Sequence, residues 1–153
     1  MTTQRMSIRD VDPSAYKAVI GLSMYAGGGT LDKGLLALVD IRASQINHCA
    51  WCLDMHAEEA REAGISQRQI DLVAAWREAG SLFDSRQRAA LAFTEAVTLI
   101  AEDGVPDEVW NAVTAHFDEK EIARLLIGIG AINVWNRINV SLCTELGPEP
   151  YKA

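Results

Sequence analysis

The chain has few cysteines and no basic cluster, and each absence excludes a class of protein. Only three of its 153 residues are cysteines. A secreted disulfide scaffold usually has a larger and even number, so we expect a reducing compartment, where a close cysteine pair is more often catalytic or metal-binding than structural. The formal net charge is −7 with no run of Lys or Arg. We therefore expect no nucleic-acid partner and no anionic membrane partner.

The sequence also lacks the marks of a leader or a membrane anchor. Residues 1–12 contain no apolar core of signal-peptide length. The most apolar stretch, residues 122–143, is interrupted by Arg124, Arg137 and three asparagines, which makes it a poor membrane span. These features predict a cytoplasmic protein with no membrane partner.

No segment shows the sustained polar–apolar alternation of a strand, and helical spacing recurs along the chain. The pattern predicts a single all-α domain over residues 1–153, with its core at about 13–143 and about seven helices. Asp12-Pro13, Asn47, Ser66, Asp84 and Asp118 are expected helix starts. The expected helices span about 13–27, 32–46, 48–63, 66–76, 85–103, 107–117 and 118–143.

Cys49, Cys52 and His56 stand at positions i, i+3 and i+7, which places them on one face of a helix. Two thiols this close can form and release a disulfide, and an imidazole one turn beyond Cys52 can take up and return its proton. The spacing therefore indicates dithiol redox chemistry.

The residues alone leave open which sulfur attacks a substrate. If Asn47 caps the helix, Cys49 lies in its first turn, where the helix dipole favours a thiolate. His56 follows Cys52 by four residues, the closest helical spacing, and therefore best assists Cys52.

Two other interpretations of the cysteine pair compete with redox chemistry. Cys49, Cys52 and His56 could supply three zinc ligands, with a fourth from His48, His116, Cys143 or a carboxylate. No second Cys-x-x-Cys is present, so we expect no metal. The pair could also be two small apolar side chains packed in a core.

The run Leu36–His56 closely resembles the core of the alkylhydroperoxidase D-like, carboxymuconolactone decarboxylase superfamily. Its most specific part is Ser-Gln-Ile-Asn-x-Cys-x-x-Cys-x-x-Asp-Met-His, which starts at Ser44. Segments 74–78, 96–100, 105–107 and 131–137 also look like the smaller single-domain members of that superfamily. The decarboxylase branch typically lacks the cysteine pair, so the peroxidase branch is the better match.

The resemblance implies a thiol peroxidase with an alkylhydroperoxidase D-like helical bundle. Cys52 would attack an organic hydroperoxide or hydrogen peroxide and become a sulfenic acid, and Cys49 would condense with it to a disulfide and water. His56 would assist proton transfer. An external dithiol or protein reductant would restore the pair, without any cofactor. The resemblance also implies homo-oligomers, commonly trimers or hexamers.

One position departs from the superfamily pattern. A Glu usually stands twelve residues before the first cysteine as part of the proton relay, and this chain has Ala37 there. Asp40, one helical turn later, and His48, beside Cys49, are the candidate replacements. The departure keeps three alternatives open: a redox sensor or scaffold with a vestigial site, a zinc-stabilised structural protein, and a lactone decarboxylase.

Overall fold

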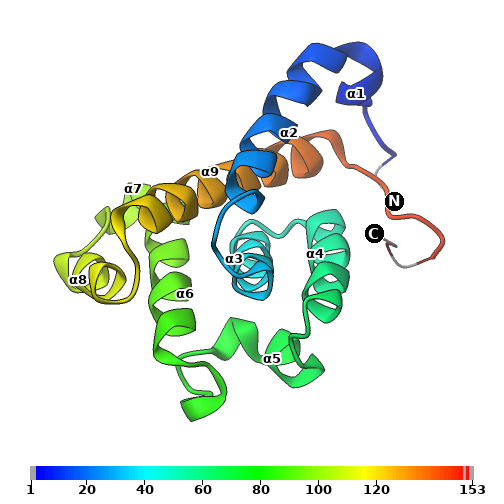
Figure 1. Cartoon of the computed structure of the whole chain (residues 1–153). Coiled ribbons are helices and arrows are strands. Elements are labelled where there is room, and N and C mark those ends of the chain that lie inside the picture. Colours follow the sequence, from blue (N-terminus) through cyan, green and yellow to red (C-terminus); the bar gives the residue numbers. More distant parts are fainter. Residues whose placement is uncertain (1–2, 150, 152–153) are drawn as a thin grey trace.

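The structure, a computed structural model that describes residues 3–149 and 151, confirms the all-α prediction (Figure 1). No strand occurs in this part of the chain. It contains one short helix that was not expected, α1, and two short 3₁₀ turns, and the helix expected over 85–103 is divided at Leu99 into α6 and α7. In chain order the elements are α1 (Ile8–Val11), α2 (Pro13–Gly27), α3 (Lys33–Ile46), α4 (Ala50–Glu62), α5 (Gln67–Leu72), η1 (Val73–Ala75), η2 (Gly80–Leu82), α6 (Ser85–Thr98), α7 (Ile100–Asp103), α8 (Asp107–His116) and α9 (Glu119–Leu142).

Side-chain caps explain why most of the long helices begin where the sequence predicts. The side chains of Asp12, Ser66, Asp84 and Asp118 accept hydrogen bonds from backbone N–H groups in the first turns of α2, α5, α6 and α9. These N–H groups would otherwise have no partner within the helix. Asp118 also forms a capping box with Glu121 at the start of α9. The helix predicted over 66–76 ends earlier, at Leu72, and continues as the 3₁₀ turn η1.

The turn between α3 and α4 differs from the prediction. Asn47 does not cap α4; it is the C-terminal cap of α3, and Cys49 is the N-cap of α4. The difference arises because His48 adopts a left-handed backbone conformation, with φ of 55°, which delays the start of α4. Cys49 therefore precedes the first helical turn.

Helix α3 lies at the centre of the fold, between α4 and α6 and below α9 (Figure 1). It contributes Leu35 and Val39 to a core shared with α6, α8 and α9. It contributes Leu38 and Ile41 to a second core shared with α4, α5 and η1. A third, smaller cluster joins Ala43 of α3 to Cys49, Cys52 and Ile132. The two cysteines thus sit where α3, α4 and α9 meet.

Helix α9 is the longest helix and crosses α2 and α3. Among the described helices it alone has the length and apolar composition to cross a membrane, a test that core helices of globular proteins also pass. Here its buried face, which includes Leu125, Ile129 and Ile132, packs against the rest of the fold. The cytoplasmic location stays a prediction.

Candidate active site

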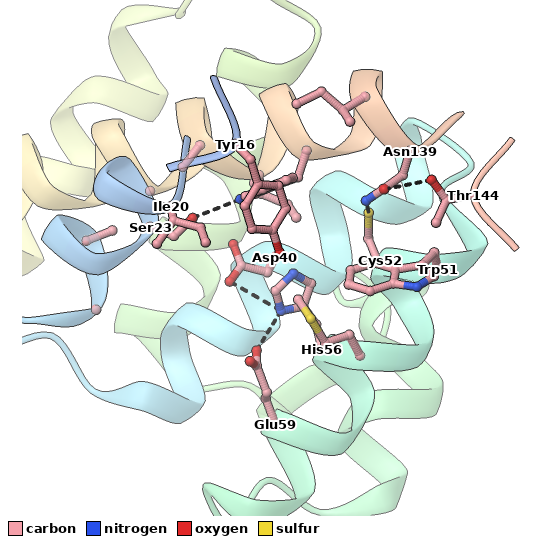
Figure 2. A pocket seen from close by; sticks show the side chains of 18 of the residues that line it. Tyr16, Ile20, Ser23, Asp40, Trp51, Cys52, His56, Glu59, Asn139 and Thr144 are labelled. Carbon is pink, nitrogen blue, oxygen red and sulfur yellow. Dashed lines mark hydrogen bonds and ion pairs between the residues drawn. The ribbon is translucent and has the colours of Figure 1, made fainter. Parts of the chain in front are cut away.

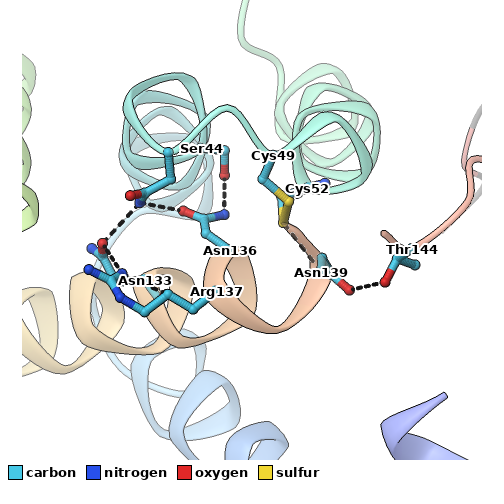
Figure 3. Close-up of a disulfide and its surroundings, with 9 residues drawn as sticks. Ser44, Cys49, Cys52, Asn133, Asn136, Arg137, Asn139 and Thr144 are labelled. Atoms are coloured by element: carbon cyan, nitrogen blue, oxygen red, sulfur yellow. Dashed lines mark hydrogen bonds between the residues drawn. A yellow bond between two sulfur atoms is a disulfide. The ribbon is translucent and has the colours of Figure 1, made fainter. Parts of the chain in front are cut away.

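Cys49 and Cys52 form a disulfide at the N-terminal end of α4 (Figure 3). Both residues are about 1% exposed. The backbone N–H of Cys52 donates to Sγ of Cys49 over 3.3 Å, so the Cys49 sulfur occupies the N-cap position that an oxygen usually fills. The disulfide is therefore built into the start of the helix.

A buried amide network fixes α9 against the α3–α4 turn that carries the disulfide (Figure 3). Asn136, fully buried, donates to Oγ of Ser44, and its Oδ1 accepts from Nδ2 of Asn47 over 2.9 Å. The same Asn47 amide donates to Oδ1 of Asn133, and Asn133 donates to Thr98. Buried polar groups of this kind stabilise a fold only when they are paired, as these are.

The disulfide faces a different cavity on each side. Cys52, but not Cys49, lines a cavity of about 830 Å³ between α2, α3, α4 and α9 (Figure 2). Its walls are largely apolar and aromatic, and they include Tyr16, Ile20, Trp51, Met55, Ile132 and Trp135. Cys49 instead lines a smaller cleft of about 290 Å³. A molecule in the larger cavity would meet the sulfur of Cys52.

Three ionisable side chains, Asp40, His56 and Glu59, form the polar side of this cavity (Figure 2). Nδ1 of His56 lies 2.7 Å from Oε2 of Glu59 and 3.6 Å from Oδ2 of Asp40. Nε2 of His56 is buried and has no hydrogen-bond partner within the described residues. Two carboxylates beside Nδ1 favour a proton on that nitrogen, and Nε2 is the ring nitrogen with no partner among the described residues.

The pKa values of Asp40 and His56 are both raised, but by different causes. Burial raises the pKa of Asp40 to about 6, although the attraction of His56 opposes the shift. Burial by itself would lower the pKa of His56, but the carboxylates of Asp40 and Glu59 outweigh it and raise that pKa above 6.5. A pKa of about 6 allows Asp40 to exchange a proton near neutral pH, and the raised pKa of His56 favours its protonated form.

Asp40, His56 and Glu59 also offer three ligand atoms within 4.8 Å of one another, a donor set that could hold a cation. The alternative zinc set of Cys49, Cys52 and His56 is not brought together in this form. The two sulfurs are bonded to each other, and Nδ1 of His56 faces the carboxylates.

The structure brings four of the five predicted site residues together: Cys49, Cys52, His56 and Asp40. The fifth, His48, is exposed and lies in the smaller cleft beside Cys49 and Cys143, away from His56. Ala37 lines the large cavity but is buried and apolar. The structure thus favours Asp40 over His48 as the partner of His56.

Two residues of the site were not predicted. Glu59 follows His56 by three residues on α4, and this helical spacing could have identified it. Asn139 donates to the sulfur of Cys52 from α9, 87 residues further along the chain, and no local spacing could have identified it.

Comparison with known proteins agrees with this arrangement. Residues 13–96 match the model of the "Carboxymuconolactone decarboxylase family". The uncharacterized protein YdfG of Bacillus subtilis (strain 168) is 34% identical over 140 residues, which cover 92% of this chain and 95% of YdfG.

Solved structures show the same fold. The crystal structure of ATU0492 from Agrobacterium tumefaciens, a protein of unknown function with a suggested assignment as the antioxidant defence protein AhpD, is 39% identical. It superposes with a TM-score of 0.92 and covers 96% of this chain and 100% of its own. The debrominase Bmp8 shares the fold at 16% identity, with a TM-score of 0.80 over 91% of this chain and 74% of Bmp8. The chain belongs to the carboxymuconolactone decarboxylase family, within the alkylhydroperoxidase D-like superfamily.

Proposed function

We propose that the protein is a thiol-dependent peroxidase that reduces peroxides through a Cys49–Cys52 dithiol–disulfide cycle. The observation that carries the proposal is a disulfide with one sulfur, that of Cys52, on a large cavity beside a histidine held by two carboxylates. The antioxidant assignment suggested for ATU0492 supports the same chemistry.

In the first step, the Cys52 thiolate attacks one peroxide oxygen and the O–O bond breaks. The leaving oxygen receives a proton, for which His56 is placed as the donor, and departs as an alcohol or water. Cys52 is then a sulfenic acid. In the second step, the Cys49 thiol condenses with it, which forms the S–S bond and releases water.

An external dithiol or protein reductant closes the cycle. It supplies two electrons and two protons, and the disulfide returns to two thiols. Asp40 holds His56 in position and shares its charge, the role that the absent Glu at position 37 would otherwise have. No cofactor enters this scheme.

The cavity supports an organic hydroperoxide better than hydrogen peroxide alone. Its volume of about 830 Å³ is far larger than hydrogen peroxide requires, and its walls are mainly apolar. Bmp8, which has the same fold, is a debrominase, and one of its variants binds 2,3,4-tribromopyrrole. A brominated aromatic compound therefore belongs among the test substrates.

We also propose that the chain forms a homo-oligomer, a trimer or a hexamer. Leu126, Ile127 and Val134 are exposed on α9, and Leu22, Met24 and Tyr25 are exposed on α2, the helix that packs against it. Apolar side chains that gather on a surface commonly mark an interface. Light scattering coupled to size-exclusion chromatography measures the assembly directly, and a monomer at micromolar concentration would contradict this part of the proposal.

The test of the peroxidase activity is to mix reduced protein with cumene hydroperoxide and follow peroxide loss and disulfide formation. We expect rapid loss, catalytic turnover when dithiothreitol is present, and no reaction in Cys52→Ser. Cys49→Ser should react once and accumulate a trappable sulfenic acid. A single stoichiometric oxidation without turnover would instead indicate a redox sensor. Peroxide loss no faster than with free dithiol would reject the proposal.

A further inference from the structure

The sulfur of Cys52 has a hydrogen-bond donor that comes from a distant part of the chain. Nδ2 of Asn139, on α9, donates to Sγ of Cys52 over 3.4 Å (Figures 2 and 3). Cys52 is about 1% exposed, so its sulfur has few solvent contacts and depends on protein donors to stabilise a charge. An N–H donor aimed at a buried sulfur stabilises the thiolate relative to the thiol and lowers the thiol pKa.

A hydrogen bond from Thr144 fixes the orientation of the Asn139 amide. Its Oδ1 accepts a hydrogen bond from the hydroxyl of Thr144 over 3.0 Å, which leaves the amide N–H facing Cys52 (Figure 3). Thr144 follows the end of α9, where Cys143 adopts a left-handed conformation with φ of 52°. The backbone N–H of Thr144 then bonds to the carbonyl of Asn139. This turn, of the Schellman type, returns the Thr144 hydroxyl to the Asn139 side chain.

The two sulfurs of the pair therefore have separate donors. Sγ of Cys49 accepts from a backbone N–H at the start of α4, and Sγ of Cys52 accepts from the Asn139 side chain. The helix start favours a thiolate at Cys49 in any chain with this motif. Only the position of α9 provides a donor to Cys52.

We propose that Asn139 is a catalytic residue that stabilises the thiolate of Cys52, and that Thr144 is a positioning residue that orients the Asn139 amide. The inference rests on the proposed dithiol cycle and acts twice in it. Asn139 favours the Cys52 thiolate that attacks the peroxide. When the reductant's thiolate attacks Sγ of Cys49 and the S–S bond breaks, Asn139 also stabilises Cys52 as the departing thiolate.

The other charged groups around Cys52 are present in every variant compared, so their charges are common to the test. In the large cavity they are Arg9 of α1, Lys33 and Asp40 of α3, and His56, Glu59 and Glu62 of α4. In the smaller cleft they are His48 and Glu145. A change in the pKa of Cys52 can then be assigned to the amide.

The test measures the pKa of Cys52 in a Cys49→Ser/Cys143→Ser background, from the pH dependence of iodoacetamide alkylation. Asn139→Leu should raise that pKa by about one unit or more, because the donor is lost. Asn139→Asp, which keeps an acceptor for Thr144, should raise it further. Thr144→Val should raise it by less, because the amide loses only its orientation. Asn111→Leu, an exposed asparagine on α8, is the matched control and should leave it unchanged.

An unchanged Cys52 pKa in Asn139→Asp and Thr144→Val would overturn the inference, and these conservative variants also cover the case in which Asn139→Leu fails to fold. The alkylation assay contains no peroxide, so it is independent of the proposed function. A shifted pKa without peroxide reduction would retain the inference and reject the peroxidase. Peroxide reduction with an unchanged Cys52 pKa would retain the peroxidase and reject the role of Asn139.

Discussion

The two sides of the disulfide differ in what surrounds each sulfur. On the Cys52 side lie a large apolar cavity, a buried histidine and two carboxylates. On the Cys49 side lie a small cleft, the exposed His48 and the free thiol of Cys143. Two cysteines three residues apart, equally buried, thus have different chemical environments. The comparison teaches that a Cys-x-x-Cys pair acquires distinct roles from the helices packed around it.

The largest effect is expected when the histidine on each side is replaced. We expect His56→Gln to lower the rate of Cys52 oxidation by peroxide about 10²- to 10⁴-fold, the usual contribution of a positioned acid or base. His48→Gln should change that rate by no more than about twofold, since it is a surface substitution outside the cavity. Stopped-flow peroxide kinetics measure both. Equal losses in the two variants would show that the sides are chemically equivalent.

The next test separates the two carboxylates beside His56. Asp40→Asn should lower the peroxide rate about tenfold and lower the His56 pKa, because the attraction that raises this pKa is lost. Glu59→Gln should have a smaller effect, since its side chain is 42% exposed and water screens its charge. NMR titration of the imidazole together with peroxide kinetics measures both effects. A larger loss in Glu59→Gln would make Glu59, rather than Asp40, the principal partner.

A pH dependence of stability should come from the same side of the disulfide. The pKa of Asp40 rises from 3.8 to about 6 on folding, and the pKa of His56 also rises. The folded state therefore binds protons more tightly than the unfolded state at both groups. Their contribution to the unfolding free energy decreases as pH rises from about 4, through 6, to above 6.5.

Asp40→Asn removes the Asp40 part of this dependence. Relative to wild type, the variant should gain stability between about pH 4 and pH 6, by about 2 kcal/mol. Urea unfolding of the two proteins at several pH values measures the difference, from which the effects of groups that do not interact with Asp40 cancel. A difference that stays constant with pH would show that Asp40 titrates normally.

The smallest effect is expected for the third cysteine. Cys143→Ser should leave peroxide turnover within about twofold of wild type, because Cys143 lies in the cleft of Cys49 and away from the large cavity. The coupled turnover assay with dithiothreitol checks this. A large loss would show that Cys143 takes part in thiol–disulfide exchange and that the Cys49 side has its own chemistry.

Much of the fold follows from local sequence signals. Asp12, Ser66, Asp84 and Asp118 cap helices as expected, since a cap requires only a side chain and the backbone two or three residues later. The prediction that Asn47 caps α4 was wrong: its side chain bonds to α9, and the left-handed backbone of His48 delays the start of α4 to Cys49. A partner 86 residues or more away cannot be recognised from local sequence.

The site shows the same division. The sequence by itself determined that Cys52 and His56 share a face of α4 and that Cys49 lies within reach of Cys52, because the helical repeat fixes neighbours at i+3 and i+4. Only the tertiary structure decided that Asp40 meets His56, that Asn139 reaches Cys52, and that Cys52 rather than Cys49 faces the large cavity. Those contacts depend on how α3 and α9 are rotated and placed against α4. That placement is set by the summed packing of three cores and a buried amide network, not by any local spacing.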